Sequence, residues 1–191
     1  MAKRVAISGG PGGGKSTVAA AVAREFGARA VVVPEVATHL LGGFFPSIDG
    51  PDDRRAVQRA IYHVQVNLEA VHRSRSGPDT VLIFDRGVLD GAAYWPDGVD
   101  AFFGDVCGDA DVARRRYDAV LFLESAAQGG FAIDSGNAAR TEQRLEAARL
   151  DSLLYQLWSP HPRFCFVSHT ERFADKIENA LAALRRLIDA P

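Results

Sequence analysis

The sequence predicts an α/β protein in which helices cover both faces of a five-stranded parallel sheet, giving three layers. Three observations predict this fold: five short apolar segments, helical periodicity between them, and a glycine cluster directly after the first apolar segment. Strands buried on both faces are continuously apolar, and the helices that connect such strands make the sheet parallel. We therefore expect a single domain over residues 1–191, with a lid-like insertion at about 126–146.

The first half of the chain is expected to alternate strands and helices. Residues 4–8 form an apolar strand, and the alanine-rich segment 15–26 forms a helix. Residues 29–36 are β-branched and continuous enough for a second buried strand, which Pro34 ends. Beyond a glycine- and proline-rich loop, apolar residues recur every three or four positions over 52–76, so this segment is expected to be a long helix. The stripe that defines it consists of Val57, Ile61, Val64, Leu68 and Val71.

The second half of the chain is expected to supply three more strands and two more long helices. The strands are expected at 81–84, 117–123 and 163–168, and the helices at 138–158 and 171–189. Residues 88–117 are expected to be irregular, apart from short helical segments near 89–94 and 101–107. We interpret the run Arg114–Arg116 as a solvated edge, and Trp95 and Trp158 as packing residues.

Composition excludes several classes of function. The chain has 22 basic and 24 acidic residues and a net charge of −2, which argues against nonspecific binding to nucleic acids. Its two cysteines, Cys107 and Cys165, lie far apart and indicate neither a disulfide framework nor a thiolate metal cluster. No apolar segment approaches 18 residues, and the first strand is too short for a signal peptide. We therefore expect a soluble cytoplasmic protein that does not insert into membranes.

The most specific motif is a glycine-rich loop, GGPGGGKS at residues 9–16, which has the spacing G-x-x-x-x-G-K-[ST]. Glycines let consecutive backbone N–H groups turn inward around an anion, and the helix that begins at Lys15 adds its positive end. Lys15 can reach the terminal phosphates, and the Ser16 hydroxyl can ligate Mg²⁺. The expected nucleotide contacts are Gly10, Gly12, Gly13, Gly14, Lys15, Ser16 and Thr17. This loop predicts ATP or GTP binding by a P-loop NTPase fold, and its resemblance to the loops of P-loop kinases implies the kinase-like strand order 2-3-1-4-5.

Missing features narrow the choice among P-loop proteins. None of the three lysines lies in an N-K-x-D motif, with which a G-protein would read guanine. A full AAA+ motor would need a helical lid domain beyond the core, for which 191 residues leave little room. A compact kinase or a small nucleotide-dependent switch remains.

Four segments together resemble a known group of proteins. They are GGPGGGKST, VPEVATHL, FDRG and NAARTEQRLEAARLD, and the similarity extends over roughly residues 4–170. In this order they resemble the P-loop group that includes nicotinamide riboside kinase domains and, more distantly, the deoxyribonucleoside kinases. The same group includes an animal protein described as binding GTP and phosphoinositide. The deoxyribonucleoside kinases carry a similar P-E step and use its carboxylate as a base, so the resemblance implies this role for Glu35.

Residues directly after the predicted strands supply the other catalytic candidates. In an open parallel sheet, ligands lie outside the carboxyl ends of the strands, where Glu35 and Asp85 are expected to meet the glycine loop. Glu35 can accept the proton of a substrate hydroxyl, Asp85 can bind Mg²⁺ through water, and Arg86 can hold phosphate oxygens. The alternatives are a solvated cap for Glu35 and a surface ion pair for Asp85 and Arg86.

The segment after the predicted lid loop contains Arg140 and Arg144, four residues apart and hence on one face of a helix. These arginines are expected to close over the nucleotide phosphates. The alternative is a solvated helix, because Glu142 and Glu146 alternate with them.

The long helix 52–76 offers candidates for binding the acceptor. Gln58, Tyr62 and Gln65 share a face opposite the apolar stripe and can hydrogen-bond a base or a carboxamide. Similar helices line the acceptor site in the kinases that the sequence resembles. Asp90 and Tyr94 are further candidates.

These observations lead to one expected function and two alternatives. We expect a Mg²⁺-dependent phosphotransferase that moves the γ-phosphate of ATP, or of GTP, to a hydroxyl of a small nucleoside-like acceptor. The first alternative is a regulatory ATP- or GTP-binding module that signals its nucleotide state to a protein or lipid partner. The second is a nucleoside monophosphate kinase, in which Arg54, Arg55 and Arg59 would form an additional phosphate pocket.

Overall fold

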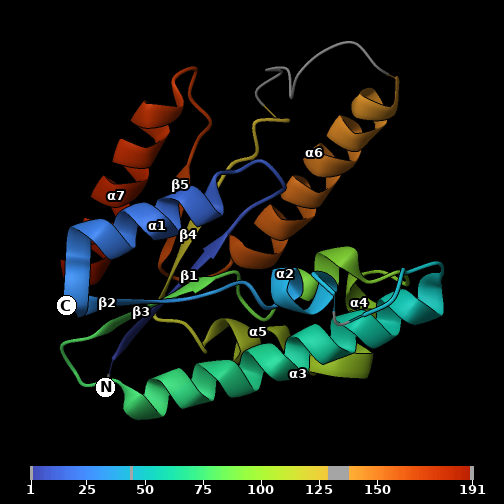
Figure 1. Ribbon diagram of the computed structural model, residues 1–191, viewed down its shortest axis with the longest axis horizontal. Coiled ribbons are helices and arrows are strands. Elements are labelled where there is room, and N and C mark those ends of the chain that lie inside the picture. Colours follow the sequence, from blue (N-terminus) through green and yellow to red (C-terminus); the bar gives the residue numbers. More distant parts are fainter. Residues whose placement is uncertain (1, 44, 129–137, 190–191) are drawn as a thin grey trace.

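The computed structural model describes residues 2–43, 45–128 and 138–189, with side chains of helix α6 from residue 143 onward. Five parallel strands form one sheet in the order β2-β3-β1-β4-β5. They are β1 (Lys3–Ser8), β2 (Ala30–Val33), β3 (Val81–Asp85), β4 (Ala119–Leu123) and β5 (Phe164–Val167). The predicted fold class and strand order are confirmed, and Figure 1 shows the central sheet between its helices.

Four long helices and several short ones surround this sheet. The α-helices are α1 (Lys15–Phe26), α2 (Val36–Leu41), α3 (Pro51–Arg75), α4 (Val99–Phe102), α5 (Ala110–Arg114), α6 (Ala138–Trp158) and α7 (Phe173–Asp189). Shorter helical segments are η1 (Gly27–Arg29), η2 (Asp90–Tyr94) and η3 (Phe103–Cys107). The expected helices near 89–94 and 101–107 are thus confirmed as η2 and η3.

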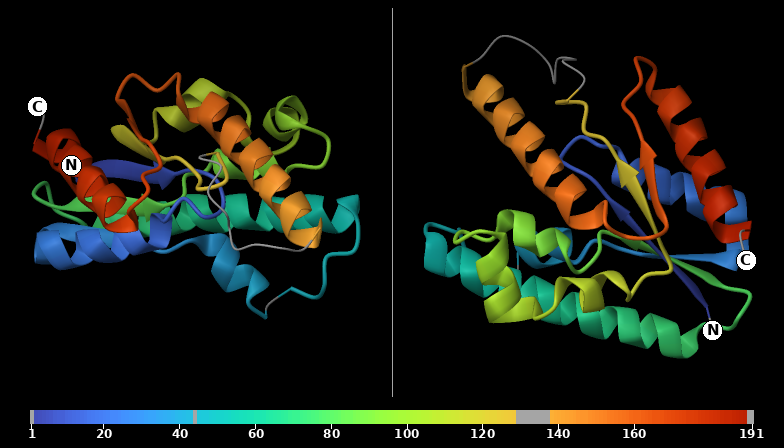
Figure 2. Two further views of the ribbon diagram at one scale, coloured as in Figure 1. Left: turned by 90° about the horizontal axis from the view of Figure 1, so that it is seen from above. Right: turned by 180° about the vertical axis from the view of Figure 1, so that it is seen from behind.

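The two faces of the sheet pack against different helices, as the views in Figure 2 show. Alternate strand residues point to opposite faces. On one face, Val5 and Ile7 of β1 pack with α1 and α7. On the other face, Ala6 belongs to a cluster that includes Leu154 and Trp158 of α6 and extends to α3. Because both faces are covered, the strands are apolar along their length, which is the pattern that predicted them.

The segment after β2 corrects one predicted boundary. The strand ends at Val33 rather than at residue 36, and α2 begins at Val36. Pro34 has no backbone N–H with which to continue the strand pairing. Glu35 is still extended, with φ −62° and ψ 119°, and precedes the first turn of α2. Glu35 therefore lies between a strand and a helix, at the carboxyl end of the sheet.

Helix α5 falls in a region that the sequence predicted to be irregular. Asp109 caps its N-terminus, because the Asp109 carboxylate accepts hydrogen bonds from the backbone nitrogens of Asp111 and Val112 at 2.7 and 3.0 Å. An acidic N-cap followed by one short turn is a weak sequence signal, and α5 has only five residues.

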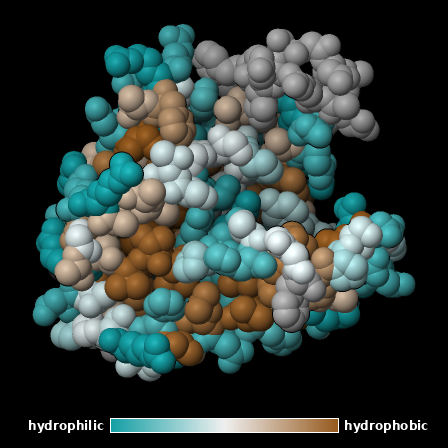
Figure 3. Space-filling view, in the orientation of Figure 1, coloured by the Kyte–Doolittle hydropathy of each residue, from teal (hydrophilic) through white to brown (hydrophobic). Residues whose placement is uncertain are grey.

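The buried face of α3 also differs from the prediction. Val64 and Val71 of the predicted stripe are 43% and 44% exposed, whereas Gln65 and Glu69 are buried. Glu69 accepts a 2.6 Å hydrogen bond from the buried hydroxyl of Tyr117, so a polar network occupies part of the inner face. The face drawn in Figure 3 carries hydrophobic residues in its lower half, where β2 and α3 lie in Figure 1.

The arginines before β4 are only partly solvated. Arg114 donates from Nε to the carbonyl oxygen of Leu157 at 2.7 Å, and Arg116 donates to Glu69 Oε2 at 2.9 Å. Arg115 is exposed, as the sequence predicted. The interpretation of this run as a solvated edge is therefore wrong for Arg114 and Arg116, because buried acceptors lie within their reach.

Among the described residues, no helix has both the length and the apolar character needed to cross a bilayer.

Candidate active site

The glycine-rich loop connects β1 to α1 and folds around the side chain of Lys15. Lys15 Nζ donates to the carbonyl oxygens of Gly9 and Gly10, both at 2.8 Å. Burial, with a further contribution from the charge of Arg86, lowers the pKa of Lys15 to about 8. Gly14 has φ +86°, and an added Cβ would lie 2.7 Å from the ring of Phe173, so glycine is required there.

A carboxylate from α6 fastens this loop. Asp151 Oδ1 accepts hydrogen bonds from the backbone nitrogen of Gly10 at 2.7 Å and from that of Ser125 at 3.1 Å. Burial raises the pKa of Asp151, although both N–H bonds favour its charged form. Asp151 was assigned no role from the sequence, although the segment NAARTEQRLEAARLD ends with it, because 141 positions separate it from Gly10.

Ser16 and Asp85 meet beside the loop. The Ser16 hydroxyl donates to Asp85 Oδ2 at 3.0 Å, and Asp85 Oδ1 is buried without a partner among the described residues. Burial raises the pKa of Asp85, while the Ser16 hydrogen bond acts against this rise. Mg²⁺ is coordinated by hydroxyl and carboxylate oxygens, directly or through water, and commonly also by the phosphates of a bound nucleotide. These two residues therefore fit a magnesium ion.

Arg86 follows β3 with a strained backbone. Its φ is +82°, and such a conformation in a non-glycine residue costs about 1–3 kcal/mol, which occurs most often at functional sites. Its backbone nitrogen bonds to the carbonyl oxygen of Ile7 at 3.0 Å. Its guanidinium donates from Nε to Glu35 and from Nη1 to Asp90 Oδ2 at 3.3 Å, and it lies 5.7 Å from the centre of the Tyr94 ring. The strained turn thus aims Arg86 between two carboxylates.

Glu35 is held in its charged form. Besides its contact with Arg86, its Oε2 accepts a 2.5 Å hydrogen bond from the hydroxyl of Thr38. Burial acts to raise the pKa of Glu35, but the charge of Arg86 and these hydrogen bonds outweigh burial and hold the pKa below its ordinary value. Glu35 is therefore an ionised and largely buried carboxylate at the carboxyl end of β2. It occupies the N-cap position of α2, but its side chain makes no capping hydrogen bond.

Asp90 is the buried partner of Arg86. Its carboxylate is 3% exposed and accepts hydrogen bonds from the Ser8 hydroxyl at 3.0 Å and from Trp158 Nε1 at 2.7 Å. Burial raises the pKa of Asp90, and the charge of Arg86 acts against this rise. Trp158, which the sequence indicated as a packing residue, thus also positions this carboxylate.

A cavity of about 510 Å³ opens beside these charges, between α2, α3 and the turn after β3. This volume suits a small molecule. The cavity brings together the predicted acceptor residues and the catalytic candidates, which are Gln58, Tyr62, Gln65, Glu35, Arg86, Asp90 and Tyr94. Most of the remaining wall is apolar, with Val36, Leu41, Ile61 and Val88.

A polar network orients the inner wall of this cavity. Gln65 donates from Nε2 to Glu69 Oε1 at 3.1 Å and to the carbonyl oxygen of Arg86 at 3.5 Å. The backbone carbonyl of Arg86 can only accept, so the Gln65 amide turns its nitrogen toward these partners. Tyr117 donates to Glu69 and accepts from the backbone nitrogen of Val88 at 2.8 Å. The Gln65 carbonyl oxygen is therefore the end of the amide left for a ligand.

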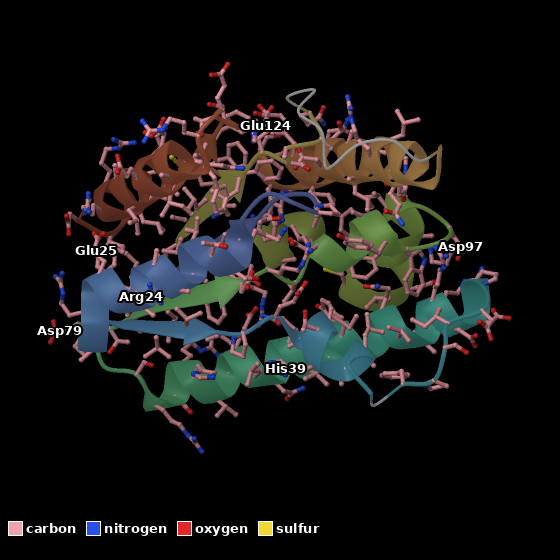
Figure 4. All side chains as sticks on the ribbon, turned by 45° about the horizontal axis from the view of Figure 1, so that its top comes forward. Arg24, Glu25, His39, Asp79, Asp97 and Glu124 are labelled. Carbon is pink, nitrogen blue, oxygen red and sulfur yellow. The ribbon has the colours of Figure 1, made fainter. Side chains whose placement is uncertain are left out.

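The three arginines near the start of α3 do not line this cavity. Arg55 is held by Asp97 at 2.6 and 2.7 Å, and Figure 4 shows Asp97 near the N-terminal end of α3. Arg59 lies 3.7 Å from Asp105, and Arg54 lines a different cavity. Arg54, Arg55 and Arg59 therefore do not belong to the wall around Glu35 and Arg86, although the cavity that Arg54 lines shares Tyr94 with it. Their role as a phosphate pocket stays a prediction.

Only part of the predicted lid belongs to the described residues. Residues 129–137 and the side chain of Arg140, in the first turn of α6, lie outside them. Arg144 lies seven positions before Asp151, and therefore on the same face of α6 and about 10 Å from it along the axis. Arg144 thus lies on the same helix face as Asp151, which binds the glycine-rich loop.

The fold and the glycine-rich loop define the chain as a P-loop kinase-like NTPase. The chain belongs to the family described as AAA domain, which matches residues 4–176. It shares its fold with the thymidylate kinase of Candida albicans, at 14% identity and a TM-score of 0.65 over 98% of this chain and 94% of that one. No curated protein matches the sequence. The expectation against a full AAA+ motor rested on chain length and stays a prediction.

Proposed function

We propose that the protein is a Mg²⁺-dependent phosphotransferase that moves the γ-phosphate of ATP, or of GTP, to a hydroxyl of a small nucleoside-like acceptor. One observation carries the proposal. The ionised Glu35 lies in the wall of a cavity that fits a small molecule, and its partner Arg86 follows the strand that ends at Asp85. A binding module that only senses nucleotide has no need of an acceptor cavity with a proton acceptor in its wall.

On the nucleotide side, the amides of Gly12, Gly13 and Gly14, with those of Lys15, Ser16 and Thr17, would hold the phosphates. The predicted contact of Gly10 would be with another atom than its N–H, because that N–H is bonded to Asp151. Lys15 would exchange the carbonyl oxygens of Gly9 and Gly10 for the β- and γ-phosphates. Ser16 and Asp85 would hold Mg²⁺, which neutralises the charge that develops on the phosphates during transfer.

On the acceptor side, Gln58, Tyr62 and Gln65 would hold the acceptor so that its hydroxyl lies between Glu35 and the γ-phosphate. The hydroxyl oxygen forms the new bond to phosphorus, its proton moves to Glu35, and ADP leaves with the electrons of the broken bond. Arg86, with Arg140 and Arg144 of the lid, would neutralise the developing charge.

The test is the release of ADP from ATP, or of GDP from GTP, in the presence of Mg²⁺ and a panel of nucleosides that includes nicotinamide riboside. We expect at least one nucleoside to accelerate this release. Glu35→Gln is expected to lower this acceptor-dependent turnover by about two orders of magnitude or more, while ATP affinity stays nearly unchanged. Unchanged turnover would remove Glu35 as the base.

The same panel separates the alternatives. Slow hydrolysis without stimulation by any acceptor would favour a regulatory module that signals to a protein or lipid partner. Stimulation by nucleoside monophosphates alone would favour a monophosphate kinase. Arg86 is the one cationic side chain in the described wall of the cavity and is already paired with Glu35 and Asp90, which supports an uncharged acceptor. We further propose a cytoplasmic, single-domain protein with residues 126–146 as its lid.

A further inference from the structure

We propose that Asp90 is a positioning residue, which keeps the Arg86 guanidinium in place while Arg86 exchanges Glu35 for the phosphate being transferred. This inference rests on the proposed phosphotransfer. It goes beyond that proposal because it assigns a role to a carboxylate that touches neither phosphate nor acceptor in the mechanism described above. It begins from the way Arg86 is shared between two acidic side chains.

The two carboxylates that hold Arg86 differ in burial and in their donors. Glu35 is 22% exposed, lies in the cavity wall, accepts one further hydrogen bond, from Thr38, and takes part in the proposed proton transfer. Asp90 is 4% exposed at its side chain and has three hydrogen-bond donors, Ser8, Trp158 and Arg86. A buried carboxylate held by several donors has little freedom to rotate. Asp90 is therefore the fixed partner of Arg86, and Glu35 the exchangeable one.

The donors to Asp90 come from separate elements of the fold. Ser8 is the last residue of β1, directly before the glycine-rich loop, and Trp158 is the last residue of α6. Asp90 itself begins η2. The carboxylate is thus fixed relative to the phosphate loop, and the guanidinium that it binds is fixed relative to the loop as well.

This arrangement has a consequence for catalysis. Glu35 accepts a proton well only when Arg86 no longer neutralises it, so the Arg86–Glu35 contact must open during transfer. Without Asp90, a guanidinium released from Glu35 would have no fixed partner on the protein. The guanidinium would then no longer be aligned with the phosphate that is being transferred. We expect a loss of Asp90 to lower kcat rather than to raise the KM for the nucleotide.

A purely structural role is the competing explanation, because Asp90 also satisfies the buried donors of Ser8 and Trp158. The two roles differ in their dependence on Arg86. A structural defect adds to a defect at Arg86, whereas a positioning residue acts only through Arg86 and has no further effect once Arg86 is altered.

The kinetic test is a double-mutant cycle with Asp90→Asn and Arg86→Lys. We expect Asp90→Asn to lower acceptor-dependent kcat by about tenfold or more, with the nucleotide KM within about twofold of the unaltered protein. In the Arg86→Lys background, Asp90→Asn is expected to change kcat by no more than about twofold. Losses that multiply in the double variant would overturn the proposal.

Matched controls remove the neutral donors and keep the carboxylate on Arg86. Trp158→Phe keeps the buried ring but removes Nε1–H, and Ser8→Ala removes the hydroxyl. Each variant leaves Asp90 its other neutral donor and Arg86, so the carboxylate stays held. We therefore expect both variants to lower the unfolding temperature and to leave kcat within about threefold of the unaltered protein. A loss of kcat in Trp158→Phe as large as that in Asp90→Asn would support the structural explanation and overturn ours.

A second readout does not depend on phosphotransfer. The NMR signals of the Arg86 Nη hydrogens, assigned by their disappearance in Arg86→Lys, report whether the guanidinium rotates. We expect separate signals in the unaltered protein and in Trp158→Phe, and averaged signals in Asp90→Asn. If Asp90→Asn does not fold, Asp90→Glu displaces the same charge by one methylene and is compared in its place.

The turnover assay and the NMR comparison test the proposed function and the role of Asp90 separately. Absence of acceptor-dependent turnover in the unaltered chain would contradict the proposed function, while the NMR comparison would still decide whether Asp90 fixes Arg86. Nη signals that stay separate in Asp90→Asn, or in Asp90→Glu where that variant replaces it, would overturn the positioning role even in an active enzyme.

Discussion

The Ser16 hydroxyl donates a 3.0 Å hydrogen bond to one carboxylate oxygen of Asp85, and the other oxygen of Asp85 is buried without a partner among the described residues. Ser16 is the second residue of the helix that follows the phosphate loop, and Asp85 ends the strand next to β1. A buried carboxylate oxygen that lacks a donor is costly, and a bound cation or its water would satisfy it. Ser16 and Asp85 therefore each have an oxygen that can coordinate Mg²⁺, next to the loop where the phosphates of a nucleotide would bind.

Asp85→Asn is expected to weaken the contribution of Mg²⁺ to nucleotide binding. Because the carboxylate would bind the ion through water, we expect about a 10- to 100-fold loss of Mg²⁺ affinity in the presence of ATP. Binding of ATP without Mg²⁺ is expected to be equal or tighter, since a negative charge near the phosphates is removed. Calorimetric titration of ATP with and without Mg²⁺ measures both effects.

The matched control is Asp79→Asn, which alters an exposed aspartate in the turn before β3, labelled in Figure 4. This variant is expected to keep the full effect of Mg²⁺ on ATP affinity. An equal effect of Mg²⁺ in Asp85→Asn and in the unaltered protein would exclude Asp85 from the metal site.

Lys15→Ala is expected to weaken nucleotide binding itself. The ammonium lies against the carbonyl oxygens of Gly9 and Gly10 and can turn from them to the phosphates. A hydrogen bond to a charged group contributes about 1.5–3 kcal/mol, which corresponds to roughly a 10- to 150-fold loss of affinity. Lys3→Ala, at the opposite end of β1, is the control and should bind ATP normally. Normal affinity in Lys15→Ala would contradict the assignment of the phosphate loop.

The phosphate loop and the covered parallel sheet were predictable because they depend on short-range signals, whereas the strand order came from the resemblance to P-loop kinases. Glycine spacing, one lysine and the preceding strand specify the loop, and continuous apolar segments specify a sheet covered on both faces. The placement of Glu35 and Asp85 at one edge followed from the rule that carboxyl ends of parallel strands share an edge. The ion pair of Glu35 with Arg86 was not predicted. Their catalytic roles stay predictions.

Other parts of the site had no such signal. The burial of Gln65 and Glu69 contradicted the apolar stripe, because periodicity counts apolar residues and does not register a buried polar network with Tyr117. Asp151 reaches Gly10 from a helix far along the chain, through a contact that exists only after the α6 helix has packed. Short-range patterns contain no information on such contacts.

The stability contributed by Glu35 is expected to depend on pH. The folded-state pKa of Glu35 lies below its ordinary value of 4.5, chiefly through Arg86, so near this pH the unfolded chain binds more protons than the folded one. The contribution is therefore complete above about pH 4.5 and is lost as the pH falls through the folded-state pKa. Comparison of the unfolding free energies of the unaltered protein and Glu35→Gln should show a difference at pH 7 that shrinks below pH 4.5. A difference that grows on acidification would contradict the ion pair.

Tyr117→Phe is expected to destabilise the fold and the wall of the cavity together. The Tyr117 hydroxyl is buried, donates to Glu69 at 2.6 Å and accepts from the Val88 nitrogen at 2.8 Å. Phenylalanine keeps the ring but leaves this N–H without an acceptor, which costs about 1–3 kcal/mol in urea unfolding. Tyr155→Phe, at a 43% exposed tyrosine, should change stability by no more than about 0.5 kcal/mol.

The functional consequence of Tyr117→Phe follows from the position of Val88 in the cavity wall. When the Val88 nitrogen loses its acceptor, the turn after β3 loosens on the acceptor side, while the phosphate loop keeps its own contacts to Asp151. We therefore expect a higher KM for the acceptor and an unchanged affinity for ATP. Equal stability losses in Tyr117→Phe and Tyr155→Phe, or a loss of ATP affinity without a change in acceptor KM, would show that this network does not shape the acceptor cavity.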